Sequence, residues 1–256
     1  VLDLGMAGSA GSTVIAQVGA ATAFLVRMRR VMEVRRPRWA SFEPLLRTGW
    51  HAGLRAMSMY AVWNLSTIVA ARIDAPTLAA NQVVNQLFIF LALVLDALAV
   101  PLHSLVAGEL GAGRADAAAH IGRRSMRLSL WGGASLGLSL AALAPFIPLL
   151  FTADSAVQSR VTGALLVLAL MQLPGAVAFA LDGALIGAHD MGWLGRQAAL
   201  NLLAFLPALA VTVRWPQLGL MGIWAAQLVW MTTRAVVNHR RWHHLTRHGF
   251  HDRVMA

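Results

Sequence analysis

The chain of 256 residues is 58% hydrophobic and 12% charged, whereas a soluble domain has about 25% charged residues. This composition is typical of a polytopic membrane protein and excludes an ordinary soluble domain. The absence of cysteine excludes disulfides, thiol catalysis and cysteine-ligated metals. The formal net charge of +10 comes from arginine, because the chain has no lysine, and its distribution along the chain accounts for it without nucleic acid.

Seven segments are apolar enough to cross a membrane, because a hydrocarbon core of about 30 Å requires about 20 mostly apolar residues in a helix. The opening VLDLGMAGSAGS has no charged n-region, so we interpret it as a membrane span rather than a signal peptide. We therefore predict an all-α integral membrane protein with about seven transmembrane helices. In chain order, the predicted spans cover residues 4–26, 50–72, 79–107, 126–150, 159–188, 193–213 and 217–236.

The spacing of these spans predicts four regions. Residues 1–26 form a lone span, and residues 27–47 form a cytoplasmic linker. The linker mixes arginine with apolar and aromatic residues, which suits an amphipathic segment on anionic headgroups. Six more spans with short connections occupy residues 48–237, and residues 238–256 form a basic, His-rich cytoplasmic tail. This arrangement is natural if the first span closes one bundle and the next six form another.

The arginines divide unequally between the two sides of the predicted spans. Seventeen of them, including Arg234, lie at one set of ends, and only Arg72, Arg160 and Arg214 lie at the opposite ends. By the positive-inside rule, the arginine-rich side and the C-terminus are cytoplasmic. We predict a multi-pass protein of the plasma membrane. Arg55 is then the only arginine well inside a predicted span.

Asp96 and Asp182 lie well inside predicted spans, where a carboxylate costs about 2.5–3.5 kcal/mol and normally faces the bundle or a water-filled cavity. Asp96 shares one helical face with Asn85 and His103, within about 20° at 100° per residue. Each carboxylate is either a proton or cation site or a clamp between helices. The polar face favours a clamp for Asp96, and Arg55, at similar depth, is the candidate ion-pair partner of Asp182.

Other polar side chains allow two interpretations. Tyr60, Trp63 and Asn64 lie mid-span, where they either line a cavity that binds flat cations by cation–π contact or pack between helices. His244 and His248 are spaced i, i+4, which suits a metal if the segment is helical. A basic, His-rich segment beside a membrane also serves as an interfacial anchor, and we predict no metal site.

We predict that the protein is not an enzyme. The sequence has no nucleophile-elbow pattern, no phosphate-binding loop and no paired metal-ligating motif on a helix. The glycines of GELGAGRADAAAH, residues 108–120, are those of a cytoplasmic turn between two spans.

Three longer stretches carry a resemblance to a known family. They are GMAGSAGSTVIAQ (5–17), LAANQVVNQLFIFLALVLDALAVPLHSLVAGELGAGR (78–114) and FALDGALIGAHDMGWLGRQAAL (179–200). In order and spacing they resemble the multidrug and toxic compound extrusion (MATE) transporters, specifically the DinF-like branch. The resemblance implies a twelve-helix fold with two six-helix lobes, of which this chain is helix six plus the C-terminal lobe. The partner implied is the missing N-terminal lobe, in the same chain or a separate one.

The resemblance also implies a function, which is antiport of cationic or amphipathic compounds against H⁺, possibly Na⁺, with no other cofactor. Asp182 matches a carboxylate on the tenth helix that contributes to a Na⁺ site in one branch. The seventh-helix counterpart falls in residues 50–72, which contain no Asp or Glu, so a complete Na⁺ site of that kind is not expected. The implied partners are the lipid bilayer and small substrates, not nucleic acid.

Two alternatives remain open at this stage. One is a flippase for lipids or lipid-linked precursors from the same superfamily, which would need a cavity rich in fixed cations. The other is a non-transporting membrane module or a degenerate fragment.

Overall fold

The computed structural model describes residues 5–31 and 42–250, which form α-helices and two short 3-10 helices and contain no β-strand. This confirms the predicted all-α fold with seven helices. The chain divides into two compact units, Val1–Leu46 and Arg47–Ala256. The α-helices are α1 (Gly5–Val31), α2 (Phe42–Ile73), α3 (Ala75–Gly111), α4 (Ala115–Leu143), α5 (Ser155–Gly187), α6 (Met191–Arg214) and α7 (Gly219–His248).

Five of these helices are long and apolar enough to cross a membrane: α1, α3, α5, α6 and α7. The other two, α2 and α4, overlap predicted spans but are less apolar. Helix α4 ends at Leu143, so the predicted span 126–150 is wrong at its C-terminal end, where a turn and a 3-10 helix (Ile147–Leu150) follow. His51 and Arg55 lie in the first half of α2, and serine and glycine fill much of the second half of α4, in SLWGGASLGLS. Helices of this kind need polar neighbours or close helix contacts within a bundle.

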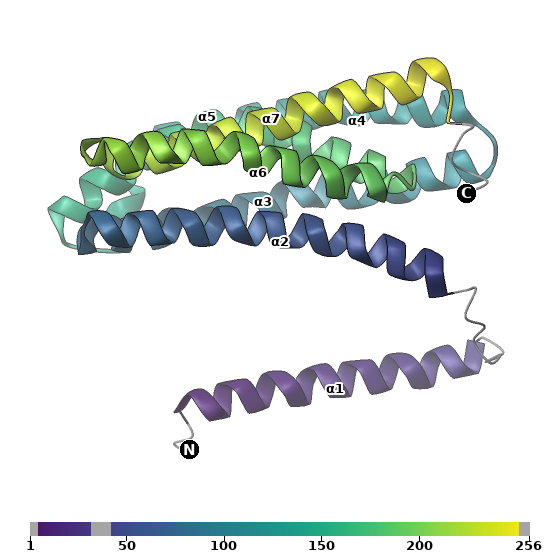
Figure 1. The fold of residues 1–256 in the computed structure, drawn as a ribbon, viewed down its shortest axis with the longest axis horizontal. Helices are drawn as coiled ribbons and strands as arrows, with labels where there is room; N and C mark the ends of the chain where they lie inside the picture. Colours follow the sequence, from purple (N-terminus) through teal and green to yellow (C-terminus); the bar gives the residue numbers. More distant parts are fainter. Residues whose placement is uncertain (1–4, 32–41, 251–256) are drawn as a thin grey trace. The chain divides into compact units, whose positions relative to one another are not determined.

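Helix α5 lies at the centre of the second unit. It packs along α3, α4 and α7, while α6 packs on α7 (Figure 1). Its sequence is apolar around the whole circumference, as expected for a helix with neighbours on several sides. At Gly183 an added Cβ would meet the backbone carbonyl oxygen of Ala99, so glycine is required for α3 and α5 to lie this close.

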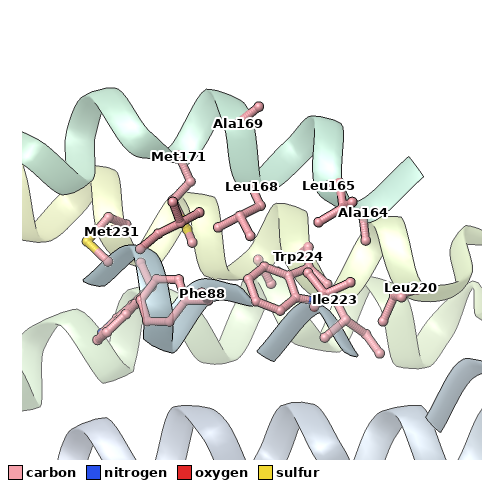
Figure 2. Close-up of a cluster of buried hydrophobic side chains, with 14 of the residues drawn as sticks. Phe88, Ala164, Leu165, Leu168, Ala169, Met171, Leu220, Ile223, Trp224 and Met231 are labelled. Carbon is pink, nitrogen blue, oxygen red and sulfur yellow. The ribbon is translucent and has the colours of Figure 1, made fainter. Parts of the chain in front are cut away.

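The largest apolar core joins α3, α5 and α7. Trp224 of α7 is fully buried, and its ring centroid lies 6.2 Å from that of Phe88 in α3. Figure 2 shows Leu168 and Met171 pointing from α5 toward these two rings. Packing of large side chains from three helices fixes the scaffold that carries the polar residues described below.

Helix α7 differs most from its prediction. The sequence predicted a span ending at residue 236 and a tail from residue 238, but α7 continues without a break through His248. Asn238, Trp242 and Leu245 are buried, so this extension has its own buried face. The prediction ended the span where the sequence becomes polar. Hydropathy shows where a chain leaves the apolar part of the membrane but not where its helix ends, and arginine is a good helix former. Residues 251–256 of the predicted tail and 32–41 of the predicted linker lie outside the described residues.

Asp74 stabilises the start of α3 in two ways. Its Oδ1 accepts a hydrogen bond from the backbone N–H of Thr77 at 2.7 Å, which is an N-cap. Its Oδ2 lies 2.9 Å from Arg160 Nη2 of α5. Thr77 hydrogen bonds and the Arg160 charge hold the pKa of the Asp74 carboxyl below its ordinary value.

We expect Asp74→Ala to lower the free energy of unfolding by about 1 kcal/mol at pH 7, because the N-cap is lost. Asp74→Asn keeps an N-cap and removes only the charge, so its effect should be smaller. Because the folded pKa is lowered, the ionic contribution is present above the unfolded pKa and is lost as pH falls through the folded value. Unfolding curves at pH 7 and pH 3 should therefore show the gap between wild type and Asp74→Asn narrowing at pH 3. A gap that widens at pH 3 would contradict this.

Candidate functional site

Asp182 of α5 is the centre of a buried polar network. Its side chain is almost fully buried, and its Oδ2 accepts hydrogen bonds from Arg55 of α2 and Arg234 of α7. Its Oδ1 accepts a bond from Asn238 Nδ2 of α7 at 2.6 Å. Both carboxylate oxygens are thus occupied, and one side chain joins three helices.

A row of buried amides leads from α6 to this carboxylate. Asn201 Nδ2 donates to Gln197 Oε1, and Gln197 Nε2 donates to Asn238 Oδ1 at 2.9 Å. Asn238 in turn donates to Asp182. Every amide donates toward Asp182, so the bonds polarise one another in the same direction and orient the carboxylate.

Arg234 requires a correction to the sequence prediction. It was counted among the arginines at the cytoplasmic ends, but its residue is only 3% exposed. Its guanidinium carbon lies 5.2 Å from the ring centroid of Phe179 and 5.6 Å from that of Trp230, both within cation–π range. Arg55 is therefore not the only arginine inside the lobe, and the two arginines share one Asp182 oxygen.

Asp96 lies near this network but outside its hydrogen bonds. It is partly buried and interacts electrostatically with Arg234, Asp182 and Arg55. It forms no hydrogen bond or ion pair with any residue in the described ranges, so this structure shows no helix clamp at Asp96. A coupling role for Asp96 stays a prediction.

Burial changes along the polar face that the sequence predicted on α3. Asn85 is buried and His103 is exposed, with the partly buried Asp96 between them. The three residues share a direction on the helix but not an environment, because the neighbours of α3 change along its length.

The structure separates the three mid-span candidates of α2. The Trp63 ring packs on Phe88, with centroids 4.7 Å apart, and belongs to the edge of the apolar core. Tyr60 is 68% exposed, and the exposed Asn64 donates through Nδ2 to the Tyr60 carbonyl at 2.8 Å. Tyr60 and Asn64 share a face that turns away from the Asp182 network.

A small pocket lies beside the network, between α2, α6 and α7. It has room for about one water molecule, whereas drug-sized ligands need about 300–1,000 Å³. In this state it is not the binding site of a whole drug-sized substrate. Its walls are formed by Arg55, Ser58, Met59, Gln197, Ala198, Asn201, Trp230 and Arg234.

Other charged groups gather near the C-terminal end of α7. Arg241 Nε donates to the buried Asp190 at 2.7 Å and the guanidinium lies 5.0 Å from the Trp193 ring centroid, which ties α7 to the turn before α6. The exposed rings of His244 and His248 stack, with centroids 4.5 Å apart. Across the described part of the chain, no three metal-ligating side chains gather at one place.

Sequence comparison places these features in a family. Residues 53–209 match the profile of the MatE family. The chain is 28% identical over 240 residues to Protein DETOXIFICATION 44, chloroplastic, of Arabidopsis thaliana, covering 92% of this chain and 45% of that protein. It is 29% identical over 244 residues to a probable multidrug resistance protein NorM of Geobacillus kaustophilus, covering 91% and 53%. The chain thus spans about half the length of the relatives it matches.

Solved structures share the fold. The MATE transporter VcmN of Vibrio cholerae, solved as a mutant, superposes with a TM-score of 0.80 at 18% identity over 96% of this chain and 57% of that one. A MOP superfamily transporter from Pyrococcus furiosus superposes with a TM-score of 0.72 at 16% identity over 80% and 45%. Its description attributes reverse polarity to its binding pocket. With the family match over most of the chain, these likenesses show that the chain belongs to the MatE family, whose members are membrane transporters and not enzymes.

Proposed function

We propose that this chain is the C-terminal part of a MATE-type exporter that moves cationic and amphipathic compounds outward in exchange for H⁺. The name of the Geobacillus relative supports multidrug export. The half-length match supports a partial transporter that works with an N-terminal lobe. The absence of Asp and Glu from residues 50–72 favours H⁺ over Na⁺. We place the protein in the plasma membrane, and the arginine distribution supports a cytoplasmic C-terminus.

The observation that carries this proposal is the Asp182 network. Because one carboxylate joins α2, α5 and α7, a change in its charge or partners changes the contacts of three helices. The side chain of Arg55 is 25% exposed, against 4% for Arg234. We assign Arg55–Asp182 as the contact that opens during transport, while Arg234 and Asn238 keep the carboxylate in place.

Protonation supplies a way to open this contact. A proton on Asp182 removes the negative charge that attracts Arg55. Release of Arg55 frees α2 from α5 and gives the lobe a second arrangement, as an exchanger with two states requires. Asp96, which interacts with the same charged groups, is the second carboxylate that takes part in coupling.

One observation favours a second candidate function, which is the flipping of lipids or lipid-linked precursors with acidic headgroups. Such a function needs a cavity rich in fixed cations, and the sequence prediction placed only Arg55 well inside a span. The structure buries Arg234 beside it, and both arginines line a pocket without acidic side chains among the described residues. Transport of a fluorescent anionic lipid but not of a cation would favour this candidate.

Transport in proteoliposomes tests the first candidate. Under an imposed pH gradient, we expect ethidium movement when the chain is combined with an N-terminal lobe, and none with the chain alone. Asp182→Asn should reduce the rate by about tenfold or more, because the charge that responds to the proton is gone.

Asp116→Asn is the matched control, because it makes the same change at an exposed residue in the first turn of α4. Its rate should equal that of the wild type, and both variants must insert equally. If Asp182→Asn keeps full pH-driven transport, Asp182 has no coupling role. Transport by the chain alone would contradict the partial-transporter assignment.

A further inference from the structure

The pocket between α2, α6 and α7 lies next to the Asp182 carboxylate, but the charged side chains that line it are positive. Two of its lining side chains are arginines, Arg55 and Arg234, and no acidic side chain of the described residues lines it. Asp182 lies behind the arginines, with Oδ2 taken by both of them and Oδ1 by Asn238. The pocket is therefore lined by positive charge, and the carboxylate has no free oxygen to offer it.

One arginine atom at this pocket has no partner. Arg234 Nη1 is buried and makes no hydrogen bond with any described residue, although Arg234 Nη2 donates to Asp182. Burying an N–H group without an acceptor costs free energy, and the cost is larger for a charged group than for a neutral one. Asn201 Oδ1, which also lies at the pocket, is a buried acceptor without a donor. The described residues thus leave Arg234 Nη1 without an acceptor, in a side chain that lines the pocket.

The local charge balance favours an anion as the acceptor. Arg55 and Arg234 carry two positive charges against one on Asp182, and an uncompensated buried charge is strongly destabilising. Asp96 is the other carboxylate that interacts with these groups, but it is partly exposed, forms no hydrogen bond with any described residue and does not line the pocket. It weakens the positive field without filling the vacant acceptor position.

We propose that the pocket binds a small monovalent anion, either chloride or a carboxylate group, between Arg234 Nη1 and the remaining N–H groups of Arg55. The pocket has the volume of about one water molecule, so a chloride ion fits after a small outward shift of the Arg55 side chain, and a carboxylate group requires a larger shift. The partly exposed side chain of Arg55 gives access from solvent. Anion binding concerns this state of the lobe and does not depend on the export proposed above.

Thermal unfolding of the full chain in detergent tests this site without a transport assay. Sodium chloride replaces sodium gluconate at fixed ionic strength, because gluconate is too large for the pocket. We expect Tm to rise saturably, by about 3 °C between 1 and 100 mM chloride if the Kd is about 10 mM. Sodium acetate is the second arm, and a rise with acetate alone would identify a carboxylate as the ligand. Failure of ethidium transport would leave this result unchanged.

Asn201→Asp is the decisive variant, because it places a negative charge in the pocket with nearly the same shape. We expect it to lose the anion-dependent rise in Tm. Asn64→Asp makes the same change on the exposed face of α2 and should keep the rise. If Asn201→Asp does not fold, Ala198→Val narrows the pocket without changing charge and should also lose the rise.

The opposing outcomes are equally clear. No rise in the wild type with either anion would mean that the pocket holds only water and would overturn the proposal. An equal rise in wild type and in the pocket variants would identify a general salt effect and overturn it as well. Asp96→Asn supplies a further sign test, because removing this negative charge should increase the apparent affinity for chloride.

Discussion

Asp182→Ala is expected to lower the free energy of unfolding by about 3–5 kcal/mol, because it leaves buried charges without a counter-ion. Arg234 is only 3% exposed and donates to Asp182, so removal of the carboxylate leaves its charge largely desolvated and without its ion-pair partner. Asn238 also loses the acceptor of its Nδ2 group. The loss therefore includes one ion pair within the core, one at its edge and a buried hydrogen bond.

Titration with a denaturing detergent in mixed micelles measures this loss, and two further variants identify its cause. Arg55→Met should cost less than Asp182→Ala, because the Arg55 side chain is 25% exposed and Asp182 keeps Arg234. The double variant Asp182→Leu with Arg234→Met should recover part of the stability, since apolar residues replace buried charges without an unpaired partner. If Asp182→Ala loses less than about 1 kcal/mol, the network is not a buried ionic cluster in the folded protein.

Trp224→Ala is expected to lower the free energy of unfolding by about 3–5 kcal/mol through a cavity in the core. Trp224 of α7 is fully buried in the core that joins α7 to α3 and α5, next to Phe88 (Figure 2). Its Nε1 also donates to Asn81 Oδ1 at 3.3 Å. The variant leaves this oxygen unpaired in addition to the cavity, and Asn81 Nδ2 already lacks a partner among the described residues.

Trp131→Ala is the matched control, because Trp131 of α4 is 78% exposed. We expect its effect to stay within about 0.5 kcal/mol, as for other exposed positions. Trp224→Phe should fall between the two, since a ring remains but the hydrogen bond is lost. The same micelle titration gives all three values. Equal losses at Trp224 and Trp131 would show that the core of Figure 2 contributes no specific packing energy.

Much of the fold could be predicted from the sequence, because a bilayer imposes both a length and a composition on each helix. The predicted spans for α3, α5 and α6 end within a few residues of the observed helices. The prediction was less accurate where a helix leaves the apolar region. Hydropathy does not predict the extension of α7 to His248, because the segment is polar on average and only one of its faces, which includes Trp242 and Leu245, is buried.

The centre of the candidate site could be predicted in part. Asp182 stands out as an acidic residue in an apolar run, and its depth pointed to Arg55, with which it forms an ion pair. Arg234 was missed because it lies close to the end of an apolar segment, where arginine normally reaches water. Helical spacing was the available signal, since Gln227, Arg234 and Asn238 fall on one face of α7.

The amides from α6 left no such signal. Gln197 and Asn201 are neutral residues, and nothing in their spacing shows that they hydrogen-bond to each other and, through Asn238, approach Asp182. Their role depends on how α6 packs against α7, which is a tertiary contact. The family of the chain and its two candidate carboxylates could thus be predicted from the sequence, whereas the row of donors that orients Asp182 required the structure.

The unbroken course of α7 has a practical consequence for handling the protein. At about 1.5 Å per residue, its 30 residues extend about 45 Å, well beyond a hydrocarbon core of about 30 Å. Because the predicted lobe ends at residue 237, hydropathy alone would suggest that the protein can be shortened there or that a purification tag can be inserted after this residue. That cut would remove Asn238 from Asp182 and Trp242 from the apolar cluster beside it. The protein should be extended or labelled only after Phe250, which belongs to the same cluster.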